Sequence, residues 1–174
     1  MKMFFVLFFV VFLSVARAER DLTFFGDVFR FAVPVMGLGM SVMEPTHEGT
    51  IQLGYSVLAS QLTSEILKST VNEKRPDGAD GKSFPSGHTA GAFTGAFFIH
   101  KRYGLEKAIL PYILAGITGY SRVEAKKHYT HDVVAGALIS GLYTWIFVDK
   151  YEKKDSQLSL NYDGSLQVRY NMKF

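Results

Sequence analysis

The sequence predicts an all-α protein: an antiparallel bundle of about five core helices, preceded by an export signal or transmembrane segment and followed by a short β-hairpin. Five apolar or amphipathic stretches are separated by short segments rich in Gly, Pro and charged residues, which is the pattern of helices joined by turns. The 174 residues, 48% hydrophobic and 20% charged, suit one globular or membrane-embedded domain. Apolar and polar residues alternate near the C-terminus, as in strands. The absence of cysteine excludes disulfides and thiolate sites.

Residues 1–18 have the organisation of an export signal. Lys2 precedes an apolar run at 3–13, and Ala16-Arg17-Ala18 supplies small residues for cleavage. The alternative is an uncleaved first transmembrane helix, for which the run is short, because a span needs about 20 residues. Cleavage would lower the formal charge from +3 to +1. The charge therefore says little about partners, and nothing indicates nucleic-acid binding.

The first two core helices follow this signal. Residues 19–30 are a mixed, partly amphipathic lead-in to a largely apolar helix at 31–43. A turn cluster at 44–49 separates it from a helix at 51–68, in which apolar residues recur at helical spacing with polar residues between them. This second helix is amphipathic, and its polar face is not expected to meet lipid.

Three further helices complete the predicted bundle. A loop at 71–84 is rich in turn residues, and the helix after it, 86–103, contains many Gly, Ala and Thr residues that permit close helix packing. Helices at 107–120 and 128–150 come next. The core apolar runs are 13 to 16 residues long, shorter than an untilted membrane span, so embedded and soluble bundles both remain open.

The C-terminal residues 155–174 predict a hairpin. A three-residue loop, Asp163-Gly164-Ser165, would place the apolar residues of both strands on one face. An isolated hairpin is marginally stable, so it is expected to pack on another surface. A final strand ending in Phe174 also resembles the closing strand of an outer-membrane barrel, but two strands cannot form one. The predicted domains are therefore 1–18, 19–154 and 155–174.

Three polar clusters fall at predicted helix ends. One contains Lys68 and Arg75; a second is Pro85-Ser86-Gly87-His88; the third contains Ser121, Arg122, His128 and Asp132. In an antiparallel bundle with short connections these ends lie together. Three cations and the free backbone amides at Ser86 and Gly87 would then form an anion site. Each cluster alone also fits an ordinary helix end, so the prediction depends on their joint occurrence.

The third cluster contains the candidate nucleophile. If the last helix begins near His128, Asp132 lies four residues on and shares its face, where a carboxylate fixes the tautomer of the imidazole. His131 is adjacent to Asp132 and points about 100° away from it, so His128 is favoured. His47 and His100 are expected at the surface away from the site, and Lys82 is expected to be a solvated loop cation.

This pattern resembles the signature of the type 2 phosphatidic acid phosphatases and vanadium-dependent haloperoxidases. Lys68, six residues and Arg75-Pro76 match its first part; the four residues 85–88 match its second; Ser121-Arg122, His128 and Asp132 match its third. The resemblance covers about residues 51–145. Only eight residues, 77–84, separate the first two parts, fewer than in many members, which leaves little material for a lid or a lipid-selecting insertion.

The resemblance implies a mechanism. His128 would attack phosphorus and become a phosphohistidine, Asp132 would orient it, and His88 would protonate the leaving oxygen and then activate water. The phosphoryl oxygens would be held by Lys68, Arg75, Ser86, Gly87 and Arg122, with no metal or other cofactor required.

We therefore expect a metal-independent phosphatase of the bacterial cell envelope that acts on a lipid phosphate or diphosphate. Cations at the opposite end of the bundle from the site favour the inner membrane with a periplasm-facing site under the positive-inside rule: Lys101, Arg102, Lys107, Lys150, Lys153 and Lys154. Phosphatidate, phosphatidylglycerol phosphate, undecaprenyl diphosphate and lipid A phosphates are all candidate substrates.

Other functions fit the same signature. The main alternative is a soluble periplasmic acid phosphatase of broad specificity, and an outer-membrane association is also compatible with the sequence. A vanadate-dependent haloperoxidase and a non-catalytic envelope protein that binds a partner through its hairpin are less favoured.

Overall fold

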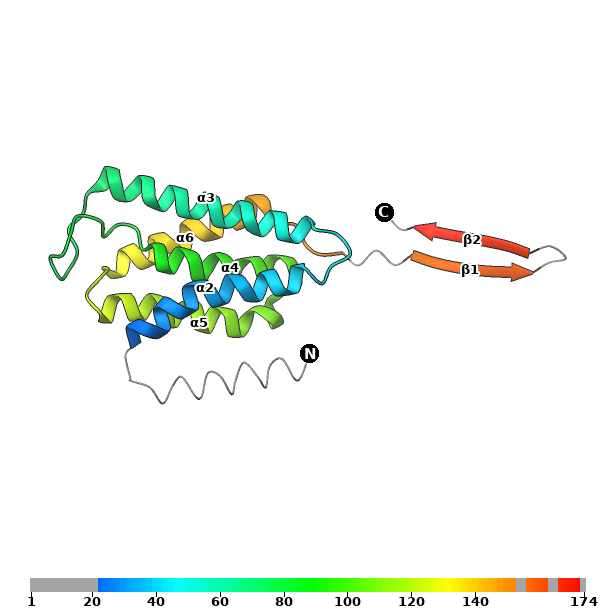
Figure 1. Cartoon of the computed structure of the whole chain (residues 1–174), viewed down its shortest axis with the longest axis horizontal. Helices are drawn as coiled ribbons and strands as arrows, with labels where there is room; N and C mark the ends of the chain where they lie inside the picture. Colours follow the sequence, from blue (N-terminus) through cyan, green and yellow to red (C-terminus); the bar gives the residue numbers. More distant parts are fainter. Residues whose placement is uncertain (1–21, 153–155, 163–165, 173–174) are drawn as a thin grey trace.

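The computed structural model describes residues 22–152, 156–162 and 166–172. Within these residues the chain forms five helices and two strands (Figure 1). The helices are α2 (Leu22–Ser41), α3 (Glu48–Val71), α4 (Gly87–Tyr103), α5 (Leu105–Glu124) and α6 (Thr130–Phe147), and the strands are β1 (Ser156–Tyr162) and β2 (Leu166–Met172). The prediction of an all-α bundle of about five core helices is confirmed. The predicted export signal, 1–18, lies outside the described residues.

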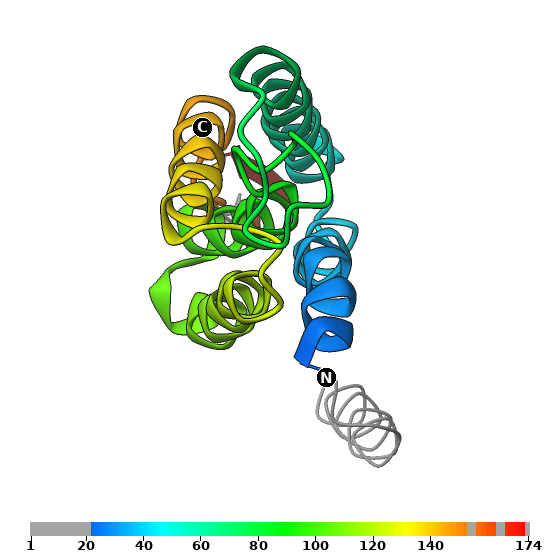
Figure 2. The same ribbon diagram turned by 90° about the vertical axis from the view of Figure 1, so that its left-hand side faces the viewer.

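Helix α4 is the central helix of the bundle. It contacts each of the other four helices, and an end-on view shows them arranged around it (Figure 2). Its buried surface is made largely of Gly, Ala and Thr residues, which let neighbouring backbones approach closely. At Gly95 the approach is so close that a Cβ atom would lie 2.4 Å from the backbone nitrogen of Pro34 on α2.

Several helix boundaries differ from the sequence prediction, and the starts of two helices matter for the site. Helix α2 begins at Leu22, nine residues before the predicted start, so most of the supposed lead-in belongs to the bundle. Helix α6 begins at Thr130, because the Asp132 carboxylate accepts a hydrogen bond from the backbone N–H of Tyr129 at 2.8 Å and caps the helix there. His128 therefore lies before the helix and not on its face.

The outer helices have their apolar faces outside and their small polar residues inside. On α3 the buried residues include Ser56, Ser60 and Ser64. The exposed large apolar residues of the same helix include Ile51, Tyr55, Leu58, Leu62 and Ile66, each 54–62% exposed. Helix α6 repeats the pattern, with buried Ser140 and Thr144 and exposed leucines. A helix on the surface of a soluble bundle has the opposite arrangement.

The end of the bundle remote from the three polar clusters is held by a buried arginine. Arg102, 2% exposed, donates to Glu44 at 2.7 Å, to the side chain of Gln52 at 2.9 Å and to the backbone carbonyl of Asp149 at 3.1 Å. These partners come from the α2–α3 connection, from α3 and from the segment after α6. One guanidinium thus joins three separate parts of the chain.

The two strands pair antiparallel, in a register that runs from Ser156 opposite Met172 to Tyr162 opposite Leu166. Among the described residues, neither strand contacts a helix. Residues 163–165 lie outside the described part of the chain. A hairpin closed by a three-residue loop and packed on another surface therefore stays a prediction.

The contact between α2 and α4 gives a stability prediction. Gly95→Ala should lower the free energy of unfolding by about 1–3 kcal/mol, as overpacking does, because the added Cβ would overlap the α2 backbone. Gly54→Ala on α3 is the matched control, since its Cβ would have no atom within 4 Å, and it should be neutral or stabilising. Thermal unfolding in detergent measures both, and equal melting temperatures would contradict the packing.

Candidate active site

A pocket of about 370 Å³ lies at the end of the bundle where α3 and α5 end and α2, α4 and α6 begin. The structure therefore brings the three polar clusters of the sequence to one place. The walls of the pocket are formed by Thr23, Asp27, Arg30, Gln61, Glu65, Lys68, Arg75, Gly87, His88, Arg122, Lys127 and His128.

His128 is held in one orientation by the α3–α4 loop. Its side chain is buried, and Nδ1 lies 2.7 Å from the backbone carbonyl oxygen of Ser83. A carbonyl oxygen only accepts, so Nδ1 carries the hydrogen and Nε2 keeps its lone pair. The nitrogen left available to the pocket is thus the one that can act as a nucleophile.

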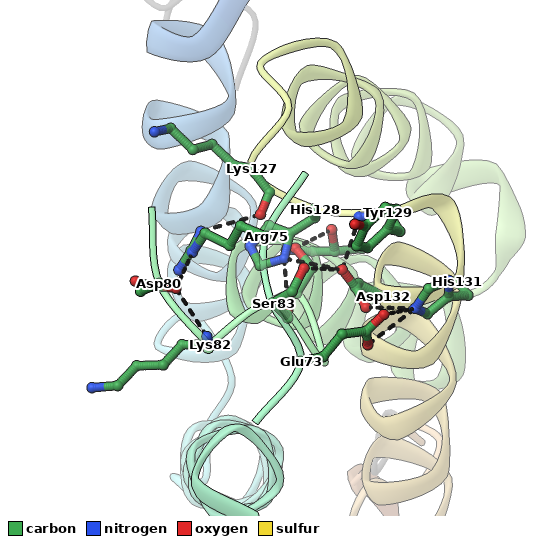
Figure 3. Close-up of polar contacts among 12 residues, drawn as sticks. Glu73, Arg75, Asp80, Lys82, Ser83, Lys127, His128, Tyr129, His131 and Asp132 are labelled. Carbon is green, nitrogen blue, oxygen red and sulfur yellow. Dashed lines mark hydrogen bonds and ion pairs between the residues drawn. The ribbon is translucent and has the colours of Figure 1, made fainter. Parts of the chain in front are cut away.

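Asp132 supports this orientation indirectly. Its Oδ2 accepts hydrogen bonds from the Ser83 hydroxyl at 2.6 Å and from the Tyr129 amide at 2.8 Å (Figure 3). The distance from Oδ2 to Nδ1 of His128 is 3.5 Å, too long for a strong hydrogen bond. Sequence spacing predicted a direct pair on one helix face. In the structure Ser83 connects the two residues, and Asp132 contributes its negative charge.

Two of the predicted phosphate ligands are flexible cations at the pocket wall. Lys68, in the last turn of α3, pairs with Glu65 at 2.7 Å. Arg75 pairs with Asp80 at 2.6 Å and donates to the backbone carbonyl of Lys127 at 3.2 Å. Both partners, Glu65 and Asp80, are largely exposed. An exposed ion pair is weak, so an arriving phosphate could displace these carboxylates at little cost.

Arg122, the third cation, is buried and fixed by α2. Its guanidinium donates to Asp27 at 2.9 Å, to the carbonyl of Thr23 at 2.6 Å and to the Ser121 hydroxyl at 3.1 Å. A planar guanidinium with this many partners keeps a fixed direction. Arg122 therefore presents its charge to the pocket in a set geometry.

Gly87 and Ser86 differ in their position. Gly87 lines the pocket, and a Cβ there would lie 3.1 Å from the ammonium of Lys68. Ser86 is buried and does not line the pocket; its hydroxyl accepts from the amide of Thr89 at 3.4 Å and from the Thr89 hydroxyl at 2.9 Å. In this structure Ser86 therefore acts as the N-cap of α4.

Helix α2 supplies two charged residues that the sequence analysis missed. Nε2 of His88 lies 2.8 Å from Oδ1 of Asp27 and 2.9 Å from Nη1 of Arg30. Their spacing of three residues puts both on one face of α2, within an otherwise apolar stretch. A charged pair in such a stretch is a recognised sign of function, and it could have drawn attention to this segment.

The remaining histidines lie elsewhere. His47 is exposed. His100, expected at the surface, is half-buried in the last turn of α4 and lies 2.8 Å from the Tyr112 hydroxyl. His131 is exposed, and its Nε2 lies 2.9 Å from Glu73 and 3.1 Å from Oδ1 of Asp132. The expectation that it points away from the Asp132 carboxylate is therefore wrong. Lys82 is exposed in the α3–α4 loop, as expected.

Electrostatics keep His128 neutral. Burial, followed by the positive charge of Arg75, lowers its pKa to about 4 against the opposing effects of the Ser83 carbonyl and Asp132. The imidazole is therefore neutral at pH 7 and becomes protonated only when the pH falls to about 4. A neutral imidazole is the form in which a histidine nucleophile reacts.

Comparison with known proteins finds a matching family and relatives. The family model of the PAP2 superfamily matches residues 49–156. A lipid A 4'-phosphatase of Helicobacter pylori is 30% identical in an alignment 164 residues long, which covers 86% of this chain and 81% of that protein. A lipid A 1-phosphatase of Porphyromonas gingivalis is 40% identical in an alignment 79 residues long, which covers 41% of this chain and 18% of that protein.

A solved structure has a similar fold. The crystal structure of Aquifex aeolicus LpxE aligns with a TM-score of 0.63 and 25% sequence identity. The alignment covers 79% of this chain and 92% of that one.

The lowered pKa of His128 can be tested by ¹⁵N-histidine NMR of the detergent-solubilised protein, with the resonance assigned by its loss in His128→Asn. The midpoint is expected at about 4. Arg75→Gln should raise it, because a neighbouring cation is removed. Lys82→Gln, which removes an exposed cation of the same loop, should leave it unchanged. A midpoint at the ordinary value for histidine would contradict the site geometry.

Proposed function

This chain belongs to the PAP2 superfamily, and from that premise we propose that it is a lipid phosphate phosphatase of the bacterial cell envelope working through a phosphohistidine. Together with its two lipid A phosphatase relatives, membership makes it a phosphoric ester hydrolase. The observation that carries the mechanism is the bond from Nδ1 of His128 to the Ser83 carbonyl, because it leaves Nε2 as a nucleophile beside three cations.

The first chemical step forms a bond between Nε2 of His128 and phosphorus. The bond from phosphorus to the leaving oxygen breaks, and that oxygen takes a proton from His88. In the second step water attacks the phosphohistidine, gives a proton to His88 and releases inorganic phosphate. The charge of Asp132, 3.5 Å from Nδ1, stabilises the positive imidazole ring that exists between the two steps.

The position of His88 between opposite charges suits a group that must both give and take a proton. Asp27, 2.8 Å from Nε2, favours the imidazolium, and Arg30, 2.9 Å from the same nitrogen, opposes it. A bound phosphate would engage the arginines and leave Asp27 as the dominant neighbour. Binding of the substrate would then promote protonation of the acid.

The phosphoryl oxygens are held by Lys68, Arg75 and Arg122 together with the amide of Gly87. These groups supply positive charge where negative charge develops in the transition state. Ser86 contributes by capping α4, and a direct contact from its hydroxyl to phosphate would require it to leave Thr89.

Lipid A phosphates are the first substrates to consider. A lipid A 4'-phosphatase is the relative that aligns over 86% of the chain, and a second relative is a lipid A 1-phosphatase. Phosphatidate, phosphatidylglycerol phosphate and undecaprenyl diphosphate remain in the test panel, because the site recognises the phosphate group that all four share.

The exposed apolar faces support an inner-membrane bundle over a soluble periplasmic enzyme. Large apolar side chains are exposed on α2, α3, α5 and α6, and extensive exposed apolar surface marks a membrane or protein interaction site. Among the described residues, α2 alone passes a test of length and composition for a membrane span. Helices α3 and α6 carry inward-facing serines and threonines, which lower their mean hydropathy without meeting lipid.

The orientation and domain arrangement complete the proposal. Three lysines lie near the end of the bundle remote from the pocket: Lys101, Lys107 and Lys150. The positive-inside rule therefore places that end on the cytoplasmic side and the pocket on the periplasmic side. Arg102 does not contribute to this charge bias, because it is buried and paired with Glu44. Residues 1–18 would act as the export signal or first membrane segment, 19–154 as the catalytic bundle and 155–174 as a hairpin tail.

The phosphatase mechanism predicts that His128→Ala abolishes phosphate release from lipid A and the three other lipids in detergent, with para-nitrophenyl phosphate as a soluble control. His47→Ala, which removes an exposed histidine far from the pocket, should retain full activity. Circular dichroism checks that both variants fold. Normal turnover by folded His128→Ala would refute the mechanism.

Membrane embedding predicts that the protein stays in the membrane pellet after a high-salt wash and is extracted only by detergent. Salt removes proteins held by charge alone, whereas the apolar faces of α3, α5 and α6 require a substitute for lipid. Release by osmotic shock would instead favour the soluble acid phosphatase.

A further inference from the structure

A second cluster of possible ligands lies beside His128 and has no part in the mechanism above. It consists of Glu73, His131 and Asp132, whose ligand atoms all lie within 4.8 Å of one another. Nε2 of His131 is 2.9 Å from Oε1 of Glu73 and 3.1 Å from Oδ1 of Asp132 (Figure 3). Such a group can be either an ion pair of a protonated histidine with two carboxylates or a metal site. The surroundings of the cluster must decide between the two.

The distinguishing observation is an unsatisfied oxygen. Asp132 is fully buried, and its Oδ1 forms no hydrogen bond among the residues that the structure describes, although Nε2 of His131 lies 3.1 Å away. That ring nitrogen is hydrogen-bonded to Glu73 instead. The other oxygen, Oδ2, is engaged by Ser83 and Tyr129. A buried carboxylate oxygen without a hydrogen bond is costly. This one is directed at the cluster, where a bound cation would satisfy it.

The distances suit a small divalent metal. A tetrahedral ion with bonds of about 2.0–2.2 Å has ligand atoms about 3.3–3.6 Å apart. The two distances from Nε2 of His131, 2.9 and 3.1 Å, would need to lengthen by only a few tenths of an ångström, and the carboxylate oxygens of Glu73 and Asp132 lie within 4.8 Å of each other. One nitrogen and two oxygens favour Zn²⁺ or a similar transition metal over Mg²⁺ and Ca²⁺, which prefer oxygen alone. His131 and Glu73 are 58% and 30% exposed, which leaves an entry path and room for water.

The ligands are already held in place. The ring of His131 stacks on Tyr129, with centroids 5.3 Å apart and planes at 9°, and Phe84 lies 6.1 Å away. The backbone carbonyl of Glu73 accepts from the amide of Ser83 at 2.9 Å. Surrounding contacts that fix the direction of a ligand are typical of metal sites.

We propose that Glu73, His131 and Asp132 bind a divalent transition-metal cation of the Zn²⁺ class, and that its binding inhibits the phosphatase. The ion would take Oδ1 of Asp132, while Oδ2 of the same carboxylate stabilises the imidazole of His128 from 3.5 Å. Withdrawing charge from Asp132 disfavours the positive phosphohistidine. The proposal that the ion inhibits the enzyme rests on the proposed function, whereas the proposal that the ion binds does not.

The test uses the full chain in detergent after removal of metals with a chelator. Zn²⁺ binding is measured by calorimetry, and Co²⁺ binding by its visible absorption, in wild type, Glu73→Gln, His131→Ala and the control His47→Ala. Wild type and His47→Ala should bind one ion alike, and the two cluster variants should bind about tenfold or more weakly. Zn²⁺ should lower wild-type activity by about tenfold and Glu73→Gln activity far less at the same concentration.

Equal metal affinity in wild type and both cluster variants, or no binding in wild type, would overturn the site. Binding that leaves the rate of phosphate release unchanged would overturn the inhibitory half. A wild-type protein that binds the ion through these residues but hydrolyses none of the phosphate esters would support the site and overturn the proposed function.

Discussion

The fold and the chemistry both depend on the buried carboxylate of Asp132. Its Oδ2 caps α6 through the amide of Tyr129 and holds the α3–α4 loop through the Ser83 hydroxyl. The same loop residue fixes the nucleophile through its carbonyl. Burying a charge is expensive unless hydrogen bonds compensate for lost water, so the two bonds to Oδ2 offset the cost of burying this carboxylate. One carboxylate therefore joins a helix start, a loop and the reactive imidazole.

A polar site at the end of a bundle with apolar outer faces requires a polar interior. The buried serines and threonines meet this need without unpaired groups at most positions, because their hydroxyls donate to a carbonyl one turn back in the same helix. Ser64, Thr94 and Thr118 do so, and Ser140 also donates to the carbonyl of Ala90 on α4. These short residues let the helices approach closely, which in turn brings the charged helix ends around one pocket.

Sequence reasoning predicted the features that follow from chain order and local pattern. The number of helices, the antiparallel connections and the convergence of Lys68, Arg75, His88, Arg122 and His128 all follow from short turns between helices. It missed contacts between side chains far apart in sequence. Asp27 and Arg122 are 95 residues apart, and no periodicity relates them.

The start of α6 was misplaced for a related reason. Spacing alone puts His128 and Asp132 on one helix face, but the carboxylate is used as a cap, and the helix begins two residues later than the spacing assumed. Ser83 then takes the place that a direct pair would have occupied. The role of Ser83 could not be predicted from the sequence. Its hydroxyl binds Asp132 and its backbone carbonyl binds His128, and a backbone carbonyl is present at every residue, so it leaves no signal in the sequence.

The central claim is that the fold aims Nε2 of His128 at the substrate phosphorus. The most direct test is to trap the intermediate in a His88→Ala variant that turns over para-nitrophenyl phosphate, whose leaving group needs no proton, so that the intermediate forms and is hydrolysed slowly. Rapid alkaline quenching followed by mass spectrometry and ³¹P NMR then locates the phosphoryl group. The account predicts phosphorylation of His128 at Nε2. A phosphoryl group on Nδ1, or on another residue, would contradict it.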